Sequence, residues 1–144
     1  MMKKMKSITG MIATLLVAGL FTGMLAGCGS TALAENFDET TVTETAEKMI
    51  DSLNAGDYES VENYFDDDMK EAIPEDKLEE AVESTLTDAG AFTEYASAAA
   101  IGQKNKQTEE DNAVAIIVAQ YENKKHTFTV SFDPDMAVNG FHMK

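Results

Sequence analysis

The spacing of apolar residues changes once along the chain, and this change constrains the fold more than any other feature. Between residues 42 and 89 apolar side chains recur at steps of three and four, which is the period of an amphipathic helix. From Phe92 onward the apolar segments are short and alternate with polar residues, which is typical of strands. The chain is therefore predicted to fold as helices followed by strands.

Three helices are predicted before the change of period. The first apolar stripe lies within 42–53 and stops ahead of Gly56. The second lies within 57–73 and has Asp57 as its N-cap. The third, opened by a proline, lies within 74–89.

Four strands are predicted after the change of period. Short polar turns separate them, and such short connections join antiparallel neighbours. The expected fold class is α+β, with three N-terminal helices packed on one face of a curved four-stranded antiparallel sheet. The predicted strands span 92–103, 113–121, 126–132 and 137–143.

The strand at 113–121 is apolar on both faces, so its second face needs a cover. The residues expected on this second face are mostly small. One interpretation is that the curved sheet or an N-terminal tether covers them, and the other is that they form a homodimer seam. These residues are Ala113, Ala115, Ile117 and Ala119.

The N-terminus has the pattern of a secretory signal. All the charge of residues 1–27 comes from three lysines in the first six positions, and the apolar stretch that follows is short for a membrane span. It ends in Leu25-Ala26-Gly27-Cys28, which is similar to a bacterial lipobox, where the cysteine thiol accepts diacylglycerol before cleavage. Cys28 is the single cysteine of the chain. The alternative is an ordinary signal peptide with an incidental cysteine.

This pattern divides the chain into three parts. Residues 1–27 are the predicted lipoprotein signal peptide, 28–40 the lipidated cysteine and a flexible tether of small and polar residues, and 41–144 the α+β domain. The mature protein is expected to be lipid-anchored at the cell membrane and to face the extracytoplasmic side.

The charge balance excludes several classes of partner and cofactor. The chain has 26 acidic and 11 basic residues, all of the latter Lys, and a formal net charge of −15, so nucleic acid and anionic headgroups are not expected partners. The acidic run Asp66-Asp67-Asp68 with Glu71 is interpreted as a solvated face rather than a Ca²⁺ site. No metal or cofactor is expected, since zinc-ligand spacing and phosphate-binding glycine loops are both absent from the sequence.

Several segments together resemble the nuclear transport factor 2-like domains of bacterial extracytoplasmic proteins. They are the run from Ala46 to Tyr58, with its Gly-Asp-Tyr turn, the stripe from Val61 to Phe65, and the closing Gly140-Phe141. The resemblance covers roughly residues 42–143 and implies a cone, in which helices close one side of a strongly bent sheet and can leave a pocket. Its motifs are structural and identify no catalytic residue.

Two functions follow as hypotheses. The first is a non-enzymatic module that binds a small apolar ligand, a peptide or an envelope protein, with Tyr64, Tyr95, His126 and Phe128 as candidate ligand-binding residues. The alternative is a small isomerase-like or dehydratase-like enzyme in which His126 and a pocket acid transfer a proton. A lone histidine at the start of an apolar strand face is more often structural, so His126 is a weak catalytic candidate.

Replacement of Cys28 by serine tests the lipobox. Cys28→Ser expressed in a bacterial host should lack the acyl mass and should leave the membrane fraction, because only the thiol can accept diacylglycerol. Mass spectrometry and membrane fractionation measure both effects. Membrane retention of this variant through an uncut segment 1–27 would count against lipobox processing.

Overall fold

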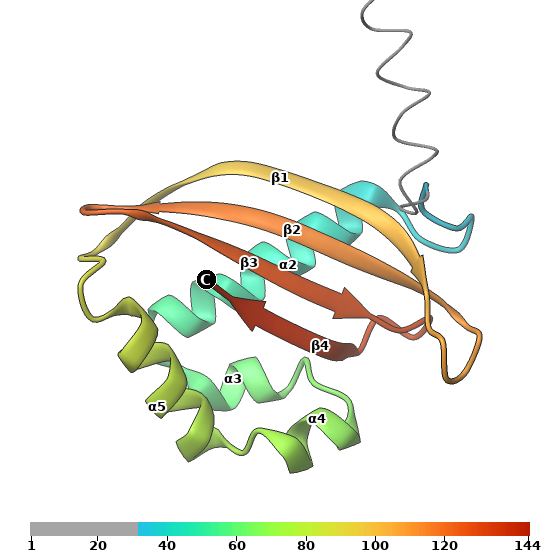
Figure 1. The fold of residues 1–144 in the computed structure, drawn as a ribbon, viewed down its shortest axis with the longest axis horizontal. Helices are drawn as coiled ribbons and strands as arrows, with labels where there is room; N and C mark the ends of the chain where they lie inside the picture. Colours follow the sequence, from blue (N-terminus) through green and yellow to red (C-terminus); the bar gives the residue numbers. More distant parts are fainter. Residues whose placement is uncertain (1–31) are drawn as a thin grey trace, which may run out of the picture. The chain divides into compact units, whose positions relative to one another are not determined.

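The computed structural model describes residues 32–144 (Figure 1). The predicted signal peptide over 1–27 and the predicted lipidation site Cys28 lie outside the described residues. Within residues 32–144 no helix is long and apolar enough to span a membrane.

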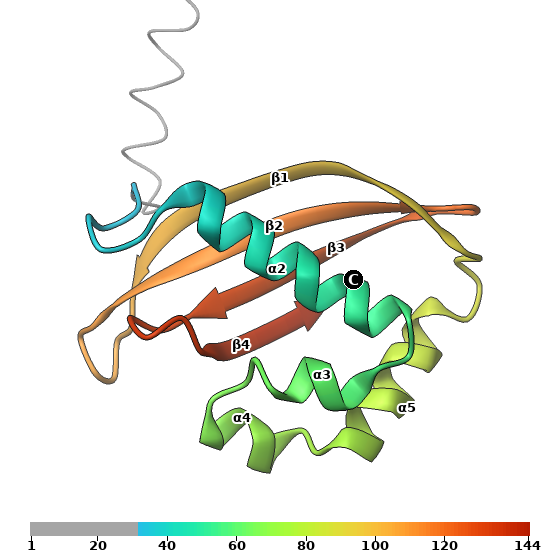
Figure 2. The ribbon, with the colours of Figure 1, turned by 180° about the vertical axis from the view of Figure 1, so that it is seen from behind.

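The observed order is helices followed by strands, which confirms the α+β class and the antiparallel meander. The sheet is open, with β1 and β4 at its edges and each strand paired to the next in sequence (Figures 1 and 2). The elements are α2 (Glu39–Asn54), α3 (Tyr58–Glu62), α4 (Asp67–Ala72), α5 (Glu75–Leu86), β1 (Phe92–Lys104), β2 (Asp111–Tyr121), β3 (Lys125–Phe132) and β4 (Val138–Met143).

The prediction of three helices was wrong, because the described part of the chain has four. The expected second helix, 57–73, is interrupted at Phe65, which forms a parallel bridge with Val138 of β4. The Val138 N–H donates to the Tyr64 carbonyl at 2.7 Å, and the Asp66 N–H donates to the Val138 carbonyl at 2.9 Å. Backbone groups used in this bridge are not available to a continuous helix, so α3 and α4 are separate.

Aspartates begin three of the helices. The carboxylates of Asp38, Asp57 and Asp66 accept from the backbone N–H three residues on, at the starts of α2, α3 and α4. Helix α2 ends at Asn54, and two residues later Gly56 has a φ of +78°, in the left-handed region that glycine adopts most easily. The tight turn between α2 and α3 therefore needs Gly56 and the cap at Asp57.

The folded part begins before residue 41, which was the predicted start of the domain. Phe37 is buried in the core, and Leu33 and Ala34 pack against it. The C-terminal part of the expected tether over 28–40 therefore packs on the domain, because its apolar residues contact the core.

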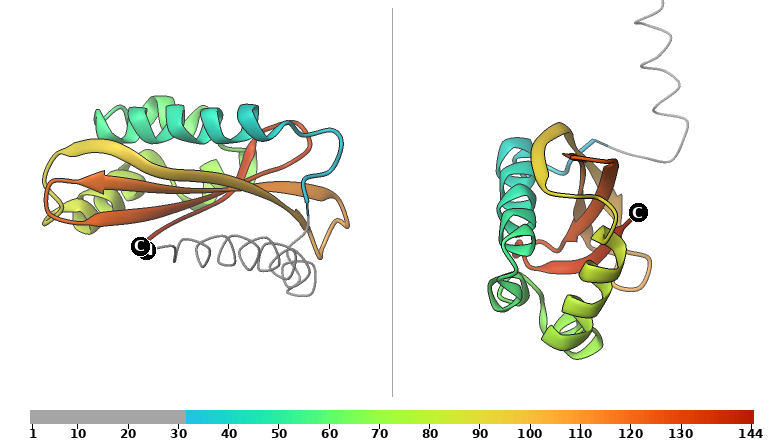
Figure 3. Two further views of the ribbon diagram at one scale, coloured as in Figure 1. Left: turned by 90° about the horizontal axis from the view of Figure 1, so that it is seen from above. Right: turned by 90° about the vertical axis from the view of Figure 1, so that its left-hand side faces the viewer.

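The register of β2 against β3 decides which face of the sheet is covered. Ala113, Ala115, Ile117 and Ala119 pair with residues of β3 that are also buried, and all four have no exposed surface. Helix α2 packs across this face (Figure 3). This face is therefore the core face. The expectation that it is a second face, covered by the curved sheet or a tether or by a homodimer seam, is wrong, because α2 covers it.

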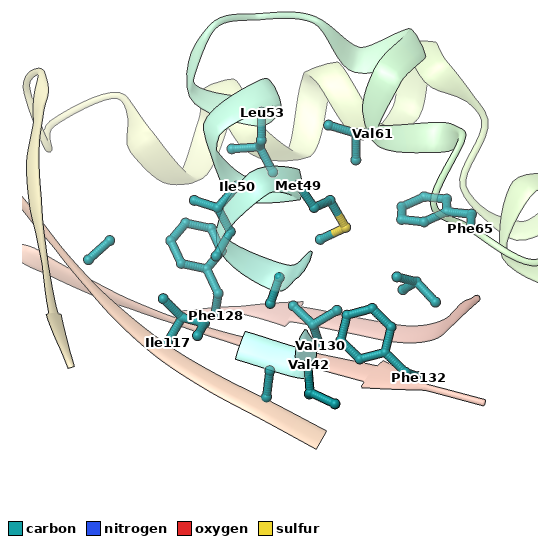
Figure 4. Close-up of a cluster of buried hydrophobic side chains, with 14 of the residues drawn as sticks. Val42, Met49, Ile50, Leu53, Val61, Phe65, Ile117, Phe128, Val130 and Phe132 are labelled. Atoms are coloured by element: carbon teal, nitrogen blue, oxygen red, sulfur yellow. The ribbon is translucent and has the colours of Figure 1, made fainter. Parts of the chain in front are cut away.

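The interior between α2 and the sheet is filled by side chains. Met49 and Ile50 of α2 point toward Phe128 and Val130 of β3 (Figure 4). The core residues that the structure describes run from Phe37 to Val138, so residues 32–144 have a core of their own, as domains that fold independently do.

Two neighbouring isoleucines of β2 test the register. Ile117 is fully buried, whereas Ile116 lies on the opposite face and is half-buried. Ile117→Ala should lower the free energy of unfolding by about 2–5 kcal/mol, because it leaves a cavity under α2. Urea unfolding of both variants is the measurement. A larger loss for Ile116→Ala than for Ile117→Ala would contradict the register.

Candidate functional site

A cavity lies where the end of α2, the end of α5 and the strands β1 and β2 meet. The cavity has a volume of about 480 Å³. We call it the α2–α5 pocket. Its lining is Leu53, Asn54, Ala55, Gly56, Tyr58, Val82, Glu83, Leu86, Thr87, Gly90, Ala91, Phe92 and Tyr121.

One wall of the pocket is the connection from α5 to β1, and hydrogen bonds fix it against the turn between β2 and β3. The Ala91 N–H donates to Glu122 Oε1 at 2.9 Å, and the Asn123 N–H donates to the Ala89 carbonyl at 2.8 Å. Gly90 has a φ of +83°, and a Cβ there would lie 2.8 Å from the Cβ of Glu122. Only glycine suits this close approach, so the wall has a defined position.

Asn54 is one of the polar residues that line the pocket, together with Tyr58, Glu83, Thr87 and Tyr121. Its Oδ1 accepts from the Tyr121 hydroxyl at 2.6 Å, which fixes the orientation of the amide. Its Nδ2 is buried and has no hydrogen-bond partner among residues 32–144. Buried amide groups are usually hydrogen-bonded, so Nδ2 is a donor that lacks an acceptor.

Aromatic rings pack behind Tyr121 and hold it in place. The Phe92 ring lies 5.7 Å from the Tyr121 ring and 4.8 Å from the Tyr95 ring, between centroids. His126 lies on the other side, with its ring 5.5 Å from that of Tyr121 in an edge-to-face contact. We call Phe92, Tyr95, Tyr121 and His126 the aromatic cluster, and it makes Tyr121 a rigid part of the pocket.

The hydroxyls of the cluster stay protonated over the neutral range. The Tyr95 hydroxyl donates toward Asp51 Oδ1 at 2.6 Å and lies 2.9 Å from the Glu47 carbonyl. Burial, followed by the hydrogen bond to Asp51 and the nearby carboxylates, raises the pKa of Tyr95 far above its usual value near 10. Burial also raises the pKa of Tyr121. Both phenols therefore act as neutral hydrogen-bond donors.

The four residues expected to bind a ligand lie in three places. Tyr95 and His126 are together in the aromatic cluster, next to the pocket but not in its lining. Phe128 is fully buried in the core and stacks on Phe141. Tyr64 lies at the bridge to β4, where its carbonyl accepts from the Val138 N–H.

His126 is buried without a polar partner. It is 6% exposed, and neither ring nitrogen has a hydrogen-bond partner in the described part of the chain. A general base works with a group that orients it or exchanges its proton. Residues 32–144 supply no such group to His126.

Asn54 is the pocket residue that sequence reasoning missed. It follows the apolar stripe of α2, and the stop signal at Gly56 accounts for an asparagine there without any further role. Tyr121, at the end of an apolar strand, is likewise typical of a core residue. One signal was available in the sequence. Asn54 ends the first predicted helix and Tyr121 ends a predicted strand, and the helices were predicted to pack on the sheet.

No group of three or more histidine, cysteine, aspartate or glutamate side chains within residues 32–144 is arranged to hold a metal ion. In the run Asp66-Asp67-Asp68, the first carboxylate caps α4 by accepting from the Met69 N–H at 2.8 Å. One residue of the run, Asp66, therefore has a structural role as the N-cap of α4.

Comparisons with known proteins give one family and one similar solved structure. A family model described as "Protein of unknown function (DUF3887)" matches residues 46–141. The fold is similar to the NMR structure of a protein from Ruminococcus gnavus, with 27% sequence identity and a TM-score of 0.68 over 79% of this chain and 97% of that chain. No curated protein matched the chain.

Stability should fall at alkaline pH because of Tyr95. Its pKa is higher in the folded than in the unfolded chain, so its contribution is complete below about pH 10 and is lost as the pH rises further. As the pH rises from about 9 to about 11, the free energy of unfolding should therefore decrease less for Tyr95→Phe than for the wild type. Urea unfolding across this range measures the difference, and equal slopes for the two proteins would contradict it.

Proposed function

The chain belongs to the family of proteins of unknown function DUF3887, and we propose that it is a lipid-anchored binding module that holds a small ligand in the α2–α5 pocket. The ligand would be a small molecule or a peptide segment with an apolar body and one hydrogen-bond acceptor. The observation that carries this proposal is the buried Asn54 Nδ2, which has no partner among residues 32–144.

The size and lining of the pocket support a small ligand. A volume of about 480 Å³ falls within the range of about 300–1,000 Å³ found for small-molecule sites. Leu53, Val82, Leu86 and Phe92 supply apolar surface for the body of the ligand. An oriented amide donor beside these apolar side chains favours an acceptor such as a carbonyl oxygen.

Tyr95 and His126 act on the ligand indirectly in this proposal. They pack against Phe92 and Tyr121, and Tyr121 in turn orients the Asn54 amide. They are positioning residues, and no proton transfer is assigned to them.

The location of the pocket is part of the proposal. Acylation of Cys28 would anchor the protein to the cell membrane and place the pocket on the extracytoplasmic side. The fold is proposed to be nuclear transport factor 2-like, because α2 covers one face of the sheet, the Gly-Asp-Tyr turn joins α2 to α3, and Gly140-Phe141 lies on the last strand.

A matched pair of probes tests the proposal. Acetophenone and ethylbenzene have similar apolar bodies, but only acetophenone has a carbonyl acceptor. In NMR titrations of ¹⁵N-labelled residues 32–144, both should shift residues of the α2–α5 pocket, and acetophenone should bind about tenfold more tightly, as expected for one hydrogen bond of about 1.4 kcal/mol.

Asn54→Asp is the matched variant. It keeps an oxygen for the Tyr121 hydroxyl and replaces the Nδ2 donor by a second oxygen. The preference for acetophenone should disappear, whereas Leu86→Trp should block both probes and Ile101→Trp, outside the pocket, should block neither. Binding of both probes elsewhere would overturn the proposal, as would a substrate turnover that His126→Phe abolishes in a folded protein.

A further inference from the structure

A second cavity, of about 390 Å³, shares no lining residue with the α2–α5 pocket. It lies where the hairpin between β1 and β2 meets the start of α4 and the start of β4. We call it the acidic cavity. Its lining includes the carboxylates of Asp66, Asp68, Glu110 and Asp133 and the amide of Asn112.

The carboxylates of the acidic cavity lack positive partners. Within residues 32–144 none of the four forms an ion pair, and no lysine is part of the lining. The neighbouring Lys104 pairs with Asp111 at 3.3 Å, outside the cavity. The cavity therefore concentrates negative charge that a cation would neutralise.

Asn112 gives the cavity a buried acceptor. It precedes Ala113, whose side chain faces α2, so the Asn112 side chain lies on the opposite face of the sheet, beside Ser131. Asn112 is 6% exposed, and its Oδ1 has no hydrogen-bond partner among the described residues. A buried acceptor without a partner, next to several carboxylates, favours a hydrogen-bond donor with positive charge.

The backbone around the cavity is held in place before any ligand binds. The Asn105 side chain accepts from the N–H groups of Gln107 and Thr108 at 2.8 and 3.2 Å, which fixes the hairpin that carries Glu110. The Oδ1 of Asp133 accepts from two N–H groups of its own turn.

A metal ion does not fit this arrangement. Calcium and magnesium need several oxygens within about 2.0–2.6 Å of one point. The described residues include no group of carboxylates arranged in that way. The separated acceptors suit a larger cation whose N–H groups point in different directions.

We propose that the acidic cavity binds an alkylammonium group. Its three N–H donors reach acceptors on separate side chains, with one donating to Asn112 Oδ1 and the others to carboxylates such as those of Asp68 and Glu110. Two sources share this chemistry, a free polyamine and the lysine side chain of a peptide. The site is independent of the ligand proposed for the α2–α5 pocket.

Titration of ¹⁵N-labelled residues 32–144 with spermidine and with trilysine tests the proposal. At least one of the two should give saturable shifts confined to residues 66–68, to the hairpin 105–112 and to residues 131–140. Binding by spermidine alone would identify a free polyamine as the source, and tighter binding by trilysine would identify a peptide. The absence of saturable shifts with both would overturn the proposal.

Three variants separate a built site from general charge attraction. Asn112→Leu, which keeps the side-chain volume and removes the acceptor, should weaken binding about tenfold, the size expected for one charge-assisted hydrogen bond. Asp68→Asn combined with Glu110→Gln should weaken it at least as much. Glu44→Gln combined with Glu80→Gln removes the same amount of charge outside the cavity. It should change the affinity less than twofold, because salt screens the interaction between distant exposed charges.

The remaining outcomes are equally decisive. Equal weakening by both double variants would overturn the proposal, because it would mean attraction by net charge only. Saturable binding of Ca²⁺ at the same residues, with an affinity above that of spermidine, would also overturn it and assign a metal site. Chemical-shift spectra of each variant before titration verify that the fold is retained.

Discussion

Close packing of α2 on the sheet is the constraint on which the rest of the structure depends. The helix lies over Ala113, Ala115 and Ala119 of β2, whose small side chains let it approach the strands. Large side chains of β3, such as Phe128 and Phe132, fill the space beside these alanines (Figure 4). Small side chains in one strand and large ones in the next let this face of the sheet pack closely against a helix.

The two cavities proposed as binding sites lie at opposite ends of β2. At one end, Asn54 and Tyr121 form the polar part of the α2–α5 pocket, and at the other, Asn112 lies in the acidic cavity. Both asparagines have an amide atom without a partner in residues 32–144. Unpaired buried amides are costly in a folded protein, so the two ends are where ligands would contribute most.

Local sequence patterns predicted most of the fold. The change of period located the boundary between helices and strands, and the stop signal at Gly56 located the end of α2. The split between α3 and α4 was not predictable in this way, because it depends on the bridge from Phe65 to Val138, far along the chain. The covered face of β2 was also missed, since it follows from the pairing of Ile117 with Phe128 and not from the composition of β2 alone. Among site residues, Tyr95 and His126 were located near the pocket, whereas Asn54 looked like an ordinary helix end.

The most direct test of the account is a set of crystal structures of residues 32–144 soaked with small fragments that carry either a carbonyl or an ammonium group. The account predicts carbonyl fragments beside Asn54 Nδ2, ammonium fragments beside Asn112 Oδ1, and none between α2 and the centre of the sheet. Fragments of either kind bound between α2 and β3, or an exchange of the two kinds between the sites, would contradict it.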